Sequence, residues 1–225
     1  MASRIFPLRR HARLMANQIS LASGAPRRLA MTTLLGSSST LAGASRTGLP
    51  YQPGMSDLAK TRRTPPKTDE PLTRCLPIGI VERYTHNEMK KIVQTPGLVL
   101  ILNEYNKTYR QIFTDGRPLP KDPQPAWDGY SIGKWDGDTL VVETTGFRDG
   151  IWLDAFGDPL TDAAKVTERF HRVDYGHLEI ELTVDDPKAY TKPWTIKLPQ
   201  LLAINTDLLD YICLENEKDL RHLVK

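Results

Sequence analysis

Short runs of β-forming residues, separated by turn signals, fill the chain from about residue 92 onward. The clearest run covers residues 177–185, where aliphatic side chains alternate with charged or polar ones. The alternating aliphatic residues are Leu178, Ile180, Leu182 and Val184. A period of two is typical of a strand that buries one face and exposes the other. About eight or nine such strands fit into roughly 130 residues, and no amphipathic segment of helix length separates them.

This pattern predicts an all-β fold, an antiparallel barrel of about eight to nine strands, with a β-sandwich as the alternative. A parallel sheet would need crossover connections, usually helices, and the strand-rich part shows no segment that could supply them. The hairpins follow one another in meander order, which favours the barrel. A barrel of about eight strands can hold one small ligand in its interior.

Two hairpins are expected from short turn dipeptides. The first turns at Asp136-Gly137, a strong two-residue signal, and would place Ile132 opposite Val141. The second is expected to turn at Tyr175-Gly176. The first hairpin contributes Tyr130 as a candidate proton relay at the mouth of the barrel.

The expected register of the second hairpin makes two charged residues candidates for a functional interior. A two-residue turn would pair His171 with Ile180 and Arg169 with Leu182, on the apolar face of the returning strand. Charged side chains on an apolar face are costly unless they are paired or line a polar cavity. Glu168 lies on the same strand and would point to the opposite face. A structural salt bridge is the alternative role for this group.

The first 44 residues differ in charge from the rest. Seven Arg and no acidic residue precede Asp57, and Arg27-Arg28 stand before a mildly apolar stretch that ends in Ala42-Gly43-Ala44. This pattern predicts an export signal over residues 1–44 and a periplasmic or secreted protein. A mitochondrial transit peptide and a plain tail are the alternatives. Removal of residues 1–44 takes away six Arg and changes the net charge from +3 to −3.

The expected domain organisation follows from this division. An extended, Pro-rich strap covers residues 45–75, and the β-barrel domain covers residues 76–225. No stripe of basic and aromatic residues remains after residue 44, so a nucleic-acid partner is not expected. No run of about 18 apolar residues is present, so no membrane-spanning helix is expected.

Cys75 and Cys213 are the two cysteines of the chain. They are expected to form one disulfide in an oxidising compartment, with two small buried hydrophobic residues as the alternative. Neither belongs to a C-x-x-C motif or lies near a His at metal-ligand spacing, so no metal site is expected.

Candidate site residues gather in the middle of the chain, although no nucleophile elbow, phosphate loop or dinucleotide fingerprint occurs. Candidates for acid–base roles are His171, Asp154, Asp115, Tyr130 and Glu168. Candidates for substrate binding are Arg117, Arg169, Trp127, Trp135, Trp152 and Trp194. Alternatively, Asp115 and Arg117 belong to a surface turn without a role in binding, and Trp152 covers the open end of the core.

Several motifs resemble a widespread family of exported bacterial proteins of unknown function. They are the strings IVQTPG from Ile92, YRQIFTDGR from Tyr109 and GKWDGDTLVV from Gly133, together with Asp185-Asp186-Pro187 followed by Trp194. The resemblance covers most of residues 72–220 and implies a lipocalin-like barrel in outline. It brings no catalytic residues to this chain.

The function expected from these features is binding of a small apolar or aromatic molecule in the cup of an exported barrel. A cofactor-independent lyase, isomerase or hydrolase that uses acid–base chemistry in the same cavity is the alternative. In that alternative, Arg117 or Arg169 would stabilise an oxyanion. A structural envelope protein without a ligand is the third hypothesis. No cofactor is expected.

Overall fold

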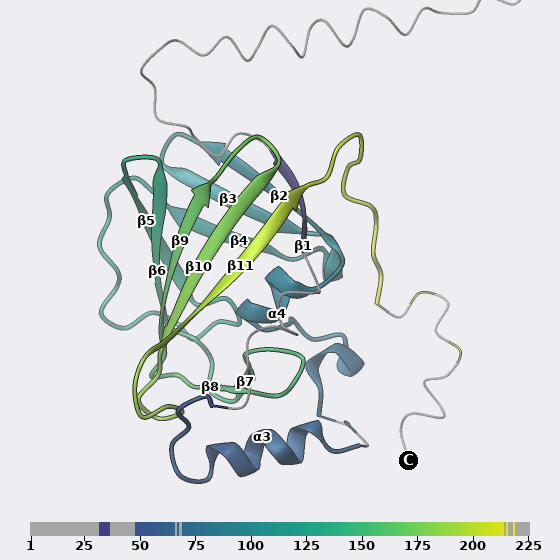
Figure 1. Ribbon diagram of the computed structural model, residues 1–225, viewed down its shortest axis with the longest axis vertical. Helices are drawn as coiled ribbons and strands as arrows, with labels where there is room; N and C mark the ends of the chain where they lie inside the picture. Colours follow the sequence, from purple (N-terminus) through teal and green to yellow (C-terminus); the bar gives the residue numbers. More distant parts are fainter. Residues whose placement is uncertain are drawn as a thin grey trace, which may run out of the picture.

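The computed structural model describes residues 32–36, 48–65, 67, 69–213, 215 and 218. Eight strands form a curled sheet in the order β11-β10-β9-β6-β5-β4-β3-β2. Their bounds are Met89–Thr95 (β2), Leu98–Asn103 (β3), Tyr109–Phe113 (β4), Tyr130–Asp136 (β5), Thr139–Thr145 (β6), Lys165–Arg172 (β9), His177–Asp185 (β10) and Trp194–Leu202 (β11). Figure 1 shows the curvature of this sheet. The all-β, barrel-like fold is confirmed.

A ninth strand, β1 (Thr32–Gly36), lies between β2 and β11 and pairs antiparallel with both, which closes the barrel. This strand falls inside the segment expected to be an export signal. The remainder of residues 1–44 lies outside the described residues. Part of the N-terminal segment therefore belongs to the sheet, because β1 fills the gap between its two edge strands.

Pairing within the barrel is antiparallel with one exception. β4 and β5 run parallel, and they are joined by the long loop 114–129. The burial pattern of β10 alternates as its sequence predicts, with Leu178 at 4% exposure and Ile180, Leu182 and Val184 at 0%. These side chains point into the barrel and form its core with residues from the neighbouring strands.

The expected register of the β9–β10 hairpin is wrong by one residue. Leu182 pairs with Glu168 and Ile180 with Phe170. The loop has three residues because Val173 N donates to His177 O, and the Asp174 carboxylate accepts the amides that follow it. A shift of one residue exchanges the faces of a strand. Glu168 therefore points inward, whereas Arg169 and His171 point outward.

The register of the β5–β6 hairpin differs from the expected one as well, because the turn lies one residue later in the sequence. In this hairpin the faces of the strands are not exchanged. Asp136 pairs with Thr139, so Gly137 and Asp138 form the two-residue loop. Gly137 has a φ of 60°, which suits the first position of a tight hairpin turn. Ile132 lies opposite Glu143 instead of Val141. Because this register differs by two residues, each side chain keeps its expected side of the sheet.

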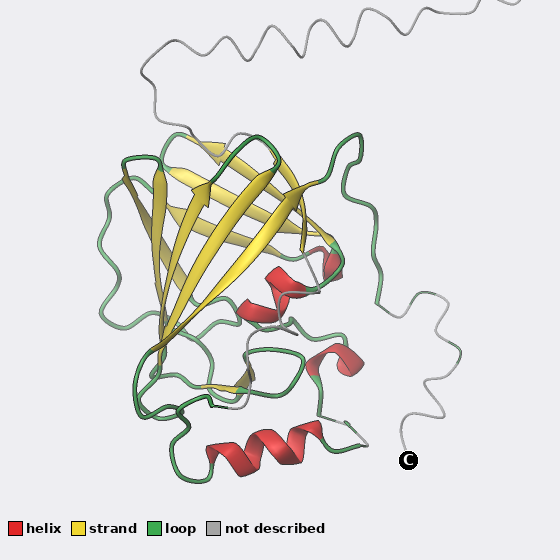
Figure 2. Cartoon of the chain, viewed as in Figure 1, coloured by secondary structure: helices red, strands yellow, loops and turns green. Residues whose placement is uncertain are grey.

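Helices and a small second sheet lie at one end of the barrel (Figure 2). The helical elements are α3 (Met55–Arg63), η1 (Pro71–Arg74), α4 (Ile80–Thr85) and η2 (Tyr105–Lys107). The small sheet pairs β7 (Ile151–Trp152) with β8 (Pro159–Leu160). The segment expected to be an extended strap thus includes the helix α3. Among the described residues, no helix combines the length and apolar character needed to cross a membrane.

α4 closes the barrel at this end. A Cβ at Gly79 would lie 2.0 Å from the carbonyl oxygen of Trp152, so only glycine allows the helix to begin this close to β7. Ile80, Val81 and Tyr84 are each at most 3% exposed and belong to the core. The packing of α4 therefore brings side chains of a helix into contact with the interior of the barrel.

The disulfide expected between Cys75 and Cys213 is confirmed. It joins the segment that leads into α4 to the chain that follows β11, across 138 positions of sequence. A disulfide is compatible with an exported protein, because such bonds persist in oxidising compartments.

Candidate ligand-binding cleft

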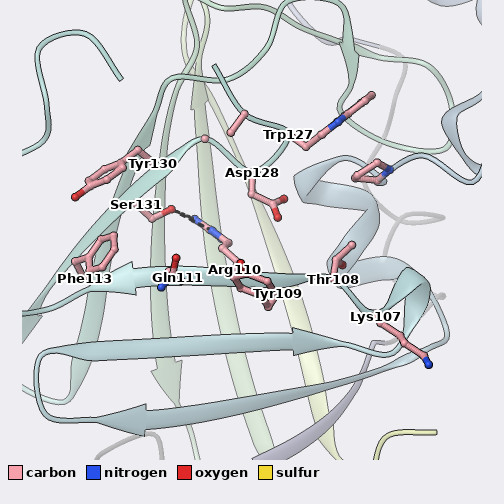
Figure 3. Close-up of a pocket in the computed structure, with 13 residues that line it drawn as sticks. Lys107, Thr108, Tyr109, Arg110, Gln111, Phe113, Trp127, Asp128, Tyr130 and Ser131 are labelled. Atoms are coloured by element: carbon pink, nitrogen blue, oxygen red, sulfur yellow. Dashed lines mark hydrogen bonds between the residues drawn. The ribbon is translucent and has the colours of Figure 1, made fainter. Parts of the chain in front are cut away.

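A cleft of about 510 Å³ opens in the barrel wall where β4 and β5 diverge. The two strands share only the pairs Ile112–Ser131 and Phe113–Ile132, so their other ends separate. The lining residues are Pro77, Lys107, Thr108, Tyr109, Arg110, Gln111, Phe113, Ala126, Trp127, Asp128, Gly129, Tyr130 and Ser131. Figure 3 shows how β4 and the end of the loop 114–129 supply most of these side chains.

Aromatic side chains form much of the wall of the cleft. Phe113 and Tyr130 stack with their ring centroids 5.3 Å apart, and the Arg117 guanidinium lies 3.9 Å from the centre of the Phe113 ring. Trp127 is half-buried, with Arg148 placed 5.1 Å from its ring centre. Aromatic faces of this kind offer a large apolar contact area together with a negative electrostatic face.

A buried ion pair forms the floor of the cleft. Arg110, from β4, donates to both carboxylate oxygens of Glu168 at 2.9 and 2.5 Å. Tyr84 donates its hydroxyl to the same carboxylate at 2.8 Å. Arg110 also donates to Ser131 at 3.1 Å and to Thr144 at 2.8 Å. All five residues are at most 2% exposed, so this polar network is both enclosed and fully hydrogen-bonded.

The two donors of this floor, Arg110 and Tyr84, both stay protonated near neutral pH. Burial alone would lower the pKa of Arg110, but the Glu168 carboxylate beside it raises that pKa above its ordinary value. Burial and the same carboxylate also raise the pKa of the Tyr84 hydroxyl, which keeps it protonated as a donor. Arg110 and Glu168 therefore act as a fixed, mutually neutralised pair.

A second ion pair joins the cleft to α4. Asp128, which lines the cleft, pairs with Nη2 of Arg83. The Arg83 side chain is 2% exposed and that of Asp128 is 19% exposed. The same Nη2 also donates to Ile78 O at 3.4 Å. Nε and Nη1 of Arg83 are buried and have no hydrogen-bond partner in the part of the chain that the structure describes.

The structure brings five of the expected site residues to this region. Trp127 and Tyr130 line the cleft, and Glu168 lies beneath it. Arg117 donates to the Tyr130 hydroxyl at 3.3 Å and to Asp115, at the edge of the cleft. Hydrogen bonds from Arg117 lower the pKa of Asp115, so this exposed carboxyl stays ionised near neutrality and is poorly suited to act as a general acid.

Three further candidates lie away from the cleft. His171 is on the outer face of β9, 3.5 Å from Asp138. Arg169, on the same face, pairs with Asp136 at 3.2 Å. Asp154 is buried beside the small sheet, where it accepts the amides of residues 156 and 158 at 2.9 and 3.2 Å. The expectation that His171 and Arg169 face the interior is wrong, because the β9–β10 loop has three residues.

The other tryptophans are dispersed over the fold. Trp152 lies in β7 with 3% exposure and has Arg62 5.3 Å from its ring centre. Trp194 packs edge-on against Tyr190 at a centroid distance of 5.4 Å. Trp135 packs against the core from β5. None of these three lines the cleft, so the expected shared aromatic cup is reduced to Trp127 and its tyrosine and phenylalanine neighbours.

The sequence alone assigned no role to the residues that organise the site: Arg110, Ser131, Thr144, Tyr84, Arg83 and Asp128. A signal for Arg110 was present, because it shares a strand face with the aliphatic Ile112. A charged side chain on such a face requires a buried partner. The partner, Glu168, could be found only with the true register of β9.

The described residues contain no group of three or more His, Cys, Asp or Glu side chains placed to hold a metal ion. Comparison with protein-family models, curated proteins and solved structures finds no match to this chain.

Proposed function

We propose that the protein is an exported barrel that binds a small, largely apolar or aromatic molecule in the cleft between β4 and β5. One observation carries this proposal: the two strands diverge around a cleft that has aromatic walls and a polar floor. A volume of about 510 Å³ falls within the range of about 300–1,000 Å³ typical of small-molecule sites. Such sites usually combine apolar walls with a few fixed polar groups.

The rigidity of the floor supports a binding role. Arg110, Glu168 and Tyr84 hold one another through hydrogen bonds and are buried, so their positions do not depend on a ligand. A preformed site loses little conformational freedom when the ligand enters, which favours affinity. The disulfide supports export, because such bonds persist in oxidising compartments.

The positions of the residues expected for acid–base catalysis support an enzyme less well than the cleft supports binding. His171 lies on β9 and does not line the cleft, and Asp154 lies at the small sheet. Glu168 is occupied by two donors, so it is committed to the floor. Binding is therefore the function that the geometry favours.

A fluorescence titration with N-phenylnaphthylamine, a neutral apolar probe, tests this proposal. The wild-type chain is expected to bind the probe with an increase in its emission. Trp127→Ala should weaken binding by about tenfold, or about 1.4 kcal/mol, because it removes the largest aromatic wall. Trp135→Ala, on β5 but outside the cleft, is the matched control and should bind as the wild type does.

Thermal melting of both variants would show whether they are folded. The proposal is overturned if the wild-type chain does not bind the probe, or if Trp127→Ala and Trp135→Ala weaken binding equally. Mass spectrometry of small molecules extracted from the purified protein then identifies the natural ligand.

A further inference from the structure

Arg83 is a buried cation whose hydrogen-bonding capacity is only partly used. Its side chain is 2% exposed, yet Nε and Nη1 have no partner among the described residues. A buried N–H without an acceptor costs about 1–3 kcal/mol, and more in a charged group. The remaining nitrogen, Nη2, carries both the bond to Asp128 and the long bond to Ile78 O.

Arg83 lies directly behind the wall of the cleft. Asp128 and Pro77 line the cleft, while Arg83 contacts Asp128 and the residue that follows Pro77. Figure 3 shows Asp128 at the side of the cleft near α4, the helix that carries Arg83. A group that enters the cleft and replaces the Asp128 carboxylate would therefore meet the guanidinium.

Guanidinium geometry identifies the group that fits. A carboxylate binds arginine best through two parallel N–H···O bonds, using either Nε with Nη2 or Nη1 with Nη2. Both arrangements need Nη2, which Asp128 occupies from one side. Asp128 is 19% exposed and lies in a loop, so its side chain can turn toward solvent. A ligand carboxylate could then form the two-point contact that Asp128 does not form.

Charge balance also favours an exchange of one carboxylate for another. Arg110 is neutralised by the fully buried Glu168, whereas Arg83 is a buried cation whose partner, Asp128, is partly exposed and can be exchanged. Loss of Asp128 without replacement would leave a buried, unpaired charge, which is strongly unfavourable. An incoming carboxylate keeps Arg83 neutralised throughout.

We propose that the ligand of the cleft is an apolar or aromatic carboxylate, and that its carboxylate displaces Asp128 to bind Arg83. This inference rests on the proposed binding function of the same cleft. The apolar body lies against Trp127, and the carboxylate reaches the α4 side of the cleft. Asp128 thus holds the place of the ligand carboxylate in the free protein.

Displacement of N-phenylnaphthylamine by two competitors of equal shape tests this inference. Naphthoate carries a carboxylate, and naphthamide is its neutral counterpart. The wild-type chain is expected to bind naphthoate at least about tenfold more tightly than naphthamide. Asp128→Asn removes the competing carboxylate, so it should strengthen naphthoate binding several-fold and leave naphthamide binding unchanged.

Two further variants complete the test. Asp136→Asn removes the same charge on the outer face of β5 and should change neither affinity, which separates local displacement from a general charge effect. Arg83→Gln should abolish the preference for naphthoate. If that variant does not fold, Asp128→Asn and Asp136→Asn still decide the question.

The inference is overturned if naphthoate and naphthamide bind the wild type equally, or if Asp128→Asn weakens naphthoate binding. It is also overturned if Asp128→Asn and Asp136→Asn strengthen that binding to the same extent. These results leave the proposed binding function intact as long as N-phenylnaphthylamine binds. Failure of the neutral probe to bind the wild type overturns the proposed function itself.

Discussion

Glu168→Leu is expected to be among the most destabilising single substitutions in the barrel. The carboxylate is 0% exposed and accepts hydrogen bonds from Arg110 at 2.9 and 2.5 Å and from Tyr84 at 2.8 Å. Removing one partner of a buried ion pair costs about 3–5 kcal/mol, because the other charge is left uncompensated. The Tyr84 hydroxyl also loses its acceptor, so the total loss should be roughly 4–6 kcal/mol.

The double variant Arg110→Met, Glu168→Leu should recover much of this loss. It leaves no buried charge, and Ser131 and Thr144 still hydrogen-bond each other at 3.0 Å. The Tyr84 hydroxyl remains without its acceptor, so the double variant should lose only about 1–3 kcal/mol. The double variant is therefore expected to be more stable than Glu168→Leu alone.

Urea unfolding of the disulfide-intact protein, followed by tryptophan fluorescence, measures both losses. With a slope of about 1–3 kcal/mol per molar urea, the single substitution should lower the midpoint by more than about 1 M. A loss below about 1 kcal/mol for Glu168→Leu would refute the reasoning, because it would mean that no buried charge is uncovered. A double variant less stable than the single one would refute it as well.

Three other predictions concern the rest of the chain. Burial and Asp154 raise the pKa of Glu82 to about 7 from 4.5, so its stabilising contribution is present below pH 4.5 and is lost as the pH rises through 7. Urea unfolding at a series of pH values should show that the wild type loses up to roughly 3 kcal/mol of unfolding free energy between pH 4.5 and 7, relative to Glu82→Gln. Equal dependence of the unfolding free energy on pH in the two proteins would contradict this. Reduction of the disulfide should lower stability by at most about 4–5 kcal/mol, and an unchanged urea midpoint would show that the cross-link is not stabilising. A chain beginning at residue 45 lacks β1, so it should melt earlier and associate more than a chain beginning at residue 30, as seen by light scattering. Equal behaviour of the two chains would mean that β1 does not stabilise the barrel.

The strand pattern predicted the fold class and the buried face of β10, because alternation is a local property of the backbone. It did not predict the register of β9, which depends on the length of one loop. The Asp174 side chain accepts two backbone amides and thereby favours a three-residue loop over a two-residue turn. The length of this loop determines whether Glu168 or Arg169 shares the inner face with the aliphatic residues of β10.

The cleft could not be predicted in this way, because it depends on a pairing between strands separated by a long loop. Loop 114–129 allows β5 to lie parallel to β4, and no local signal in the sequence specifies that direction. Trp127 and Tyr130 were recognised as candidates from their surroundings in sequence. Arg83 was not, because α4 was not expected and the contact with Asp128 is formed only in the folded chain.

Charged side chains do lie on the apolar inner face of the barrel, but they are Arg110 and Glu168 and not Arg169 and His171. Arg110 reaches from β4 to Ser131 of β5 and Thr144 of β6, at distances of 3.1 and 2.8 Å. Side chains thus connect the two strands near the point where their backbone pairing ends. Because that connection runs beneath the surface, the strands can stay apart above it without exposing the core. The buried ion pair therefore explains both why the barrel tolerates a divergent pair of strands and why a cleft exists at that position.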